Sequence, residues 1–237
     1  HHRSSAASDV YKRQVVKVPE VDNSTNRIEE AVEITIDDQL KVNGKGTITF
    51  SGYEKSNMFD RLERIKSDDR KDDFYKAMLE KGNNNFLLNE YKERNTFDYE
   101  DPFHVDFDFT IANYVSSSSD KLFINLNMSQ DDVEAISSTP PVKVAIDYSH
   151  KYTGEYKIKF TIPEGYEVEY IPKNMTRSSD LCDISIEYSH EGNVINYAHV
   201  VKTNFLLLSK EEQEQVNASV KKVRRSFKEV VVLKRKQ

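Results

Sequence analysis

The stretch FHVDFDFTI, residues Phe103–Ile111, decides the fold class of this 237-residue chain. Apolar side chains occupy every second position, and His, Asp and Thr fill the positions between them. Successive side chains of a β-strand point to opposite faces of a sheet, so this alternation predicts a strand with one apolar and one polar face. The chain is therefore expected to contain a half-buried sheet.

The segment 27–115 is predicted to form an α+β unit of two strands, two helices and two strands. Strands are expected at Ile28–Ile36, Leu40–Phe50 and Phe86–Arg94, in addition to the one quoted above. Apolar residues at helical spacing predict the two helices between them: Met58, Leu62, Ile65, Phe74 and Met78.

The segment 116–237 is predicted to form a β-sandwich-like unit, because short strands alternate there with turn signals. It begins with a loop at Ser116–Ser119, and Ser129 with Asp131 and Asp132 marks the expected start of a short helix. The expected strands are Lys121–Asn127, Val142–Tyr148, Glu155–Ile162, Tyr166–Ile171, Cys182–Tyr188, Asn193–Val201 and Glu229–Lys234.

One helix, residues 210–227, is expected near the end of this unit. Ser209 and Glu212 have the spacing of a capping box, which predicts the helix start. An apolar stripe along it must pack on the sheet: Val216, Val220, Val223 and Phe227. The overall fold class is thus mostly β, with α+β character.

The beginning of the chain is not expected to be part of the fold. Ser4–Gln14 is the in-frame translation of a transposase-type sequencing adapter, so residues 1–14 are expected to be a disordered scar in a sequence of metagenomic origin. Residues 15–26 are polar and are predicted to be a linker. The reading frame is expected to have been broken upstream of Val15, with the loss of a preceding domain and any signal peptide.

Composition excludes several classes of function. The chain has 34 Lys and Arg against 40 Asp and Glu, a net charge of −6, which becomes −8 without residues 1–14. This balance predicts no nucleic-acid partner, since phosphate binding needs a basic face. No apolar run approaches the roughly 20 residues that span a bilayer. No cofactor is expected, and one cysteine excludes a disulfide framework.

Few residues suggest chemistry, and no catalytic residue is predicted. No metal site is predicted either. His104, Asp106 and Asp108 share one face of a strand, which is more often just the solvent-exposed face of a half-buried sheet; the alternative is a metal site, if another strand adds ligands. Cys182 shares its strand face with apolar residues, which predicts a buried structural thiol. His199 is predicted to be a packed histidine.

Several segments resemble a known family. They are the sequence IPEGYEVEYIP at Ile162–Pro172, the helix after Ser209, the closing Val-Val-Val-Leu-Lys and the Gly-spaced strand Leu40–Phe50. Together they resemble the β-rich region of unknown function that follows the core of bacterial transglutaminase-like proteins, in which another domain of unknown function precedes the core. That family uses a Cys, a His and an Asp of the core, and none of them has a counterpart here.

The resemblance implies a non-catalytic accessory module of a larger transglutaminase-like protein. Such a module is expected to pack on a missing upstream domain, and export signals in the family imply a periplasmic or cell-surface location. The alternative is a binding module for an extended peptide or glycan at a sheet edge or end loop. An exposed aromatic patch favours that alternative, while a cluster of His, Asp and Glu favours a third class, a metal-dependent hydrolase.

Overall fold

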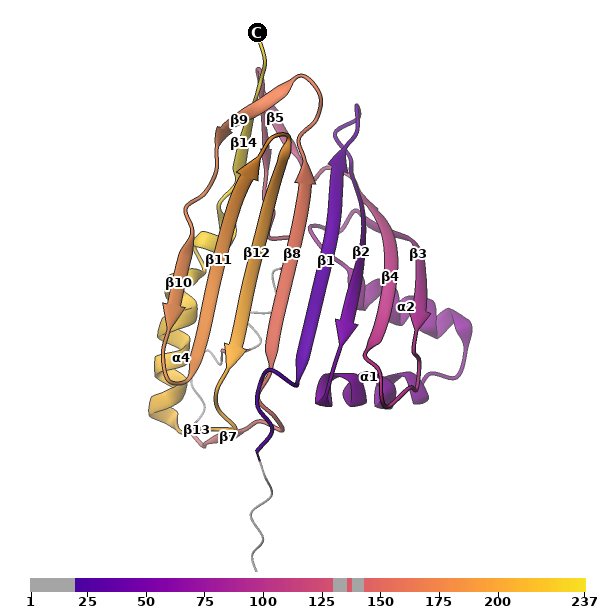
Figure 1. Cartoon of the computed structure of the whole chain (residues 1–237), viewed down its shortest axis with the longest axis vertical. Coiled ribbons are helices and arrows are strands. Elements are labelled where there is room, and N and C mark those ends of the chain that lie inside the picture. The colour runs from indigo at the N-terminus through magenta and orange to yellow at the C-terminus, as the bar shows by residue number, and fades with distance from the viewer. Residues whose placement is uncertain (1–19, 130–135, 138–142) are drawn as a thin grey trace, which may run out of the picture.

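The computed structural model of the chain describes residues 20–129, 136–137 and 143–237. The predicted adapter segment 1–14, the linker up to residue 19 and the residues Asp131 and Asp132 of the predicted short helix lie outside the described residues. A large sheet fills the front of the molecule in Figure 1, and the helices and a smaller sheet lie behind it.

The large sheet has eight strands in the order β10-β11-β12-β8-β1-β2-β4-β3. Neighbouring strands are antiparallel except β1 and β8, which run parallel. Every strand predicted for this sheet is confirmed within a few residues, and β10 is an addition that the sequence analysis missed. The strands are β1 (Arg27–Ile36), β2 (Val42–Phe50), β3 (Phe86–Arg94), β4 (Phe103–Ile111), β8 (Thr153–Thr161), β10 (Met175–Ser178), β11 (Cys182–Glu191) and β12 (Val194–Thr203).

One face of this sheet is buried and the other is polar, as the alternation in β4 predicts. Phe103, Phe107 and Phe109 of β4 are buried, whereas Asp108 between them is exposed. The same alternation of burial runs through β1, β8, β11 and β12. The predicted mostly-β fold class is therefore confirmed.

Two helices cover the β2-β4-β3 side of the buried face. They are α1 (Tyr53–Glu63), which contacts β2, and α2 (Asp68–Leu79), which contacts β3. Both confirm the predicted pair. The apolar spacing places Met58 and Leu62 of α1 in the core, as amphipathic packing requires.

A smaller sheet and a third helix cover the other side of the buried face (Figure 1). This sheet has the order β5-β6-β14-β9. The predicted loop at Ser116–Ser119 is wrong in part: Ser116–Ser118 forms a strand that pairs with β6, because backbone pairing does not depend on the polar side chains that suggested a loop. The strands are β5 (Ser116–Ser118), β6 (Lys121–Ile124), β9 (Tyr166–Tyr170) and β14 (Val231–Arg235). Two short strands, β7 (Ile146–Asp147) and β13 (Leu207–Leu208), form a separate pair.

The third helix, α4 (Lys210–Val223), begins with the predicted capping box. Ser209 Oγ accepts a hydrogen bond from the Glu212 backbone N–H at 3.2 Å, and the Glu212 carboxylate accepts one from the Ser209 N–H at 2.8 Å. The helix ends four residues earlier than predicted, and a 3-10 turn, Ser226–Lys228, carries Phe227. All four residues of the predicted stripe are nevertheless buried.

The segments 27–115 and 116–237 share the large sheet. β1 and β8 lie side by side at its centre, with Val32 opposite Ile158. Ion pairs cross this junction on the polar face, one between Arg27 and Glu155 at 2.9 Å and one between Lys159 and Glu33 at 3.0 Å. The buried side chains of both segments form one hydrophobic core. None of the described helices is long and apolar enough to cross a membrane.

Candidate functional site

The three residues predicted as possible metal ligands lie on the open face of the sheet. His104 Nδ1 lies 2.9 Å from Thr49 Oγ1, and Asp106 holds the Arg94 guanidinium through bonds of 2.7 and 3.0 Å. The bonds from Arg94 lower the pKa of Asp106, while burial lowers the pKa of His104. Within the described part of the chain, no group of three or more His, Cys, Asp and Glu residues is placed to hold a metal ion. That no metal binds here stays a prediction.

Cys182, the single cysteine of the sequence, begins β11 inside the core. It is 2% exposed and lies opposite Thr203 of β12. Ser179 Oγ accepts a hydrogen bond from the backbone N–H of Cys182 at 3.1 Å and donates one to the Cys182 carbonyl at 3.0 Å. Burial raises the pKa of the thiol, so the neutral form is favoured. The predicted burial is confirmed, and a thiolate nucleophile would need the opposite shift.

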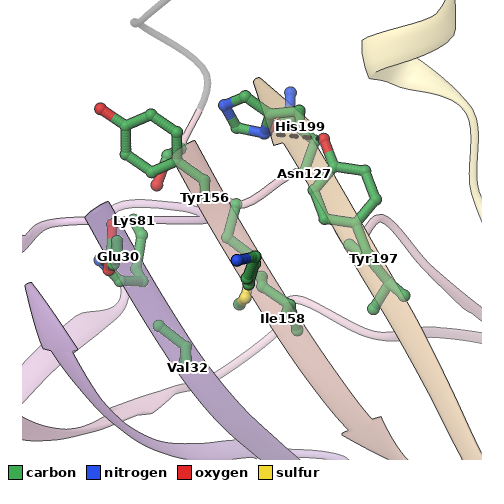
Figure 2. Close-up of a pocket in the computed structure, with 12 residues that line it drawn as sticks. Glu30, Val32, Lys81, Asn127, Tyr156, Ile158, Tyr197 and His199 are labelled. Carbon is green, nitrogen blue, oxygen red and sulfur yellow. Dashed lines mark hydrogen bonds and ion pairs between the residues drawn. The ribbon is translucent and has the colours of Figure 1, made fainter. Parts of the chain in front are cut away.

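His199 on β12 is packed among aromatic rings, as predicted. Its ring stacks on Tyr156 with centroids 4.6 Å apart, and Phe227 meets it edge-on at 5.3 Å. Its Nδ1 lies 3.0 Å from the Tyr197 hydroxyl, a contact drawn as a dashed line in Figure 2. His199 is 1% exposed. Its contact with Phe227 joins the large sheet to the turn that follows α4.

A buried ion pair lies beside this histidine and was missed by the sequence analysis. Glu30 of β1 and Lys81, just after α2, are 6% and 5% exposed, and Lys81 Nζ lies 2.7 Å from Glu30 Oε1. Charged residues are almost never this buried unless they are paired. The signal in the sequence is Glu30 itself, which occupies the apolar phase of β1 together with Val32 and Ile34.

The Lys81 ammonium makes further contacts besides Glu30. It donates a hydrogen bond of 3.0 Å to the carbonyl of Leu79, the last residue of α2, and lies 4.9 Å from the centre of the Phe107 ring. A carbonyl at the end of a helix lacks an intrahelical partner, and an aromatic face attracts a cation. Lys81 therefore ties the end of α2 to two strands of the large sheet.

A small cavity lies between the ion pair and the histidine. Figure 2 shows Glu30 and Lys81 at one side, His199 and Asn127 at the other, and Tyr156 between them. The volume that water can reach is about 10 Å³, which is room for about one water molecule. The Oδ1 atom of Asn127 has no hydrogen-bond partner among the described residues, so one water would satisfy it. A site of this size can fix side chains but cannot admit a peptide or a sugar.

The sequence at Ile162–Pro172 forms the connection between the two sheets. β8 leaves the large sheet at Thr161, the chain turns at Gly165 with a φ of +81°, and β9 enters the small sheet at Tyr166. The Tyr166 N–H closes the turn by donating to the Pro163 carbonyl at 3.2 Å. An open groove of about 490 Å³ lies here, lined in part by Glu164 and His190.

Comparison with known families bears on the second half of the chain. Residues 120–233 match the family model DUF3858, described as a domain of unknown function with a solved structure. The chain contains a DUF3858 domain. The predicted region of unknown function is confirmed to that extent. Comparison with curated proteins and with solved structures gives no match.

The DUF3858 domain does not form the sheet alone. The match begins at Asp120, just before β6, and ends in β14, so it includes β8, β10, β11 and β12 but not β1–β4. Its strand β8 pairs with β1, from Arg27 opposite Thr153 at one end to Ile34 opposite Phe160 at the other. The Glu30–Lys81 pair belongs to the preceding segment, while Asn127 and His199 of the same cavity belong to the domain.

Proposed function

We propose that this chain is a non-catalytic accessory module of a larger transglutaminase-like protein, in which it orients or supports a catalytic domain. The observation that carries the proposal is the position of Cys182. The chain's single thiol lies within a core strand, and burial raises its pKa. Thiol chemistry in the intact protein would then come from a cysteine in another domain. His199, likewise, is enclosed by aromatic rings.

The transglutaminase-like context rests on the resemblance at Ile162–Pro172 and in the closing Val-Val-Val-Leu-Lys. A periplasmic or cell-surface location is part of the same proposal and has the same basis. The sheet fits a supporting role, because its central β1–β8 pairing joins the DUF3858 domain to the segment before it.

The experiment is reconstitution with a transglutaminase-like catalytic domain that carries the Cys, His and Asp of the family. The Tm and the rate of glutamine deamidation of that domain are measured with and without this chain. We expect the chain to raise the Tm of the partner, and we expect no deamidation by the chain alone. Deamidation by the chain alone that is lost in Cys182→Ser would overturn the proposal.

A binding role is the second candidate, and a specific observation favours it. The loop between β3 and β4 carries two exposed rings, Phe97 at 43% and Tyr99 at 68% exposure. An exposed aromatic patch is the feature expected to favour a peptide- or glycan-binding module. Aromatic side chains are enriched at protein interfaces, where they supply contact area at low entropic cost.

A further inference from the structure

We infer that the β3–β4 loop, residues 95–102, is a docking surface for a cationic, arginine- or lysine-bearing segment of a partner protein. This inference rests on the binding role proposed above and names the partner's chemistry. The loop lies at the same end of the large sheet as α1 (Figure 1).

The two exposed rings of the loop are held in place from below. Phe59 of α1, itself 1% exposed, lies 5.1 Å from the Phe97 ring and 5.5 Å from the Tyr99 ring, measured between centroids. Phe103, at the start of β4, contacts the same Phe59 ring at 5.4 Å. The exposed rings are thus the outer layer of a packed aromatic cluster, and a partner would not have to order them on binding.

The backbone of the loop is fixed by its own polar groups. Asp98 Oδ1 accepts hydrogen bonds from the N–H groups of Glu100 and Asp101 at 2.9 and 3.2 Å, and Asn95 Nδ2 donates to the Pro102 carbonyl at 3.0 Å. Asn95 and Phe97 both have positive φ, at 60° and 58°. A bulky residue rarely adopts this conformation, and here it directs a large apolar ring toward solvent.

The charge of the loop defines the partner. Asp98, Glu100 and Asp101 are sequence neighbours of Phe97 and Tyr99, and none of these carboxylates forms an ion pair within the described residues. The nearby Lys55 is 7% exposed and donates to the Asp101 backbone carbonyl at 2.8 Å, so it does not cover the surface. Negative charge beside an exposed tyrosine face attracts guanidinium and ammonium groups and repels phosphate. A basic peptide segment fits this surface, while nucleic acid and anionic lipid do not.

The test is a titration of the isotopically labelled full chain with a short peptide of alternating Arg and Leu, followed by amide NMR shifts. The same peptide with Gln in place of each Arg is the control ligand. We expect the Arg peptide to shift amides of residues 95–103 and to bind more weakly as salt is raised. Tyr99→Ala and the double variant Glu100→Gln with Asp101→Asn are each expected to weaken binding about three- to tenfold.

Two control variants carry the same changes elsewhere. Tyr170→Ala removes an exposed ring from β9, and Asp38→Asn removes an exposed carboxylate at the turn between β1 and β2. Neither is expected to change the affinity. Unchanged affinity in both loop variants, or equal binding of the Gln peptide, overturns the inference. Shifts confined to β3 would overturn it and leave the binding role standing. No shift with either peptide would also overturn it, and a binding role would then have to involve another ligand, such as a glycan.

Discussion

Glu30 and Lys81 form an ion pair inside the hydrophobic core, with 2.7 Å between Oε1 and Nζ. The pair joins β1 at the centre of the large sheet to the end of α2. The desolvation of two buried charges costs several kcal/mol per ion, so the pair gives little net stability, but loss of one partner leaves the other charge uncompensated. The pair is therefore expected to be sensitive to single substitutions.

Lys81→Met is expected to lower the free energy of unfolding by about 3–5 kcal/mol, because Glu30 then remains buried without a cation. The double variant Glu30→Leu with Lys81→Met is expected to recover most of that loss, since an apolar pair carries no desolvation cost. Urea unfolding followed by circular dichroism measures both. Lys159→Met is the matched control: its ion pair with Glu33 is exposed and should contribute below about 1 kcal/mol. A double variant as unstable as Lys81→Met would contradict this account.

Cys182 is expected to react slowly with a thiol reagent at neutral pH, since burial both shields the sulfur and raises its pKa. In urea the same thiol is expected to react completely within minutes. Cys182→Ser is expected to lose about 1–3 kcal/mol of stability, because it places a hydroxyl in an apolar site. Labelling of the native chain as fast as the unfolded chain would show that the strand opens or that the site is exposed.

The elements of the fold follow from local sequence to a greater extent than their arrangement does. The alternation in β4 predicts both its strand and its buried face, and Ser209 with Glu212 predicts the start of α4. By contrast, the parallel pairing of β1 with β8 joins segments far apart in the chain, and no local pattern encodes it. Serine side chains carry little information about backbone pairing, so the sequence predicts a loop where the strand β5 forms.

The polar contacts of the candidate site were harder to predict than its apolar ones. Periodicity identified Cys182 and His199 as core residues. It did not identify Lys81, because the pairing of Lys81 with Glu30 depends on how the chain returns to the sheet after α2. It also did not separate Phe97 and Tyr99 from the other aromatic residues, because their exposure depends on the conformation of the β3–β4 loop.

Asp106 is expected to give stability a small dependence on acid pH. Hydrogen bonds from Arg94 hold the pKa of Asp106 in the folded chain below its unfolded value of about 3.9. The Asp106 carboxylate therefore stabilises the folded chain at pH values above its unfolded pKa, and this stabilisation is lost as pH falls through its folded pKa. Asp106→Asn is expected to be less stable than the parent near neutral pH, by below about 1 kcal/mol, since both side chains are partly exposed. The difference should vanish in urea titrations near pH 2, and a constant difference would contradict the assignment.

Gly44 is expected to tolerate no side chain. A Cβ built there would overlap the ring of Phe109, which is itself 1% exposed on the neighbouring strand. Gly44→Ala is expected to cost about 1–3 kcal/mol through overpacking. Phe109→Leu shortens the side chain, so the double variant should be more stable than the sum of the two single changes. A double-mutant cycle with additive effects would show that the Phe109 ring moves away without cost.

Phe227 provides the last prediction, because it tests how the end of the chain is held on the sheet. The 3-10 turn after α4 places this ring edge-on against His199, and the Phe227 carbonyl accepts a hydrogen bond from Asn125 Nδ2 at 3.0 Å. Phe227→Ala is expected to cost about 3–5 kcal/mol, as for other buried aromatic residues. Ser209→Ala removes only the cap of α4 and is expected to cost about 1 kcal/mol.

The two variants differ in where the loss should occur. Hydrogen exchange is expected to rise in α4 for Ser209→Ala, but in α4, β12 and β14 together for Phe227→Ala. The reason is that Phe227 packs on His199 of β12 and lies in the turn that links α4 to β14. A neutral Phe227→Ala would mean that the turn contributes nothing to the core. In that case α4 would be a mobile arm, and a binding role for this end of the chain would gain support over a structural one.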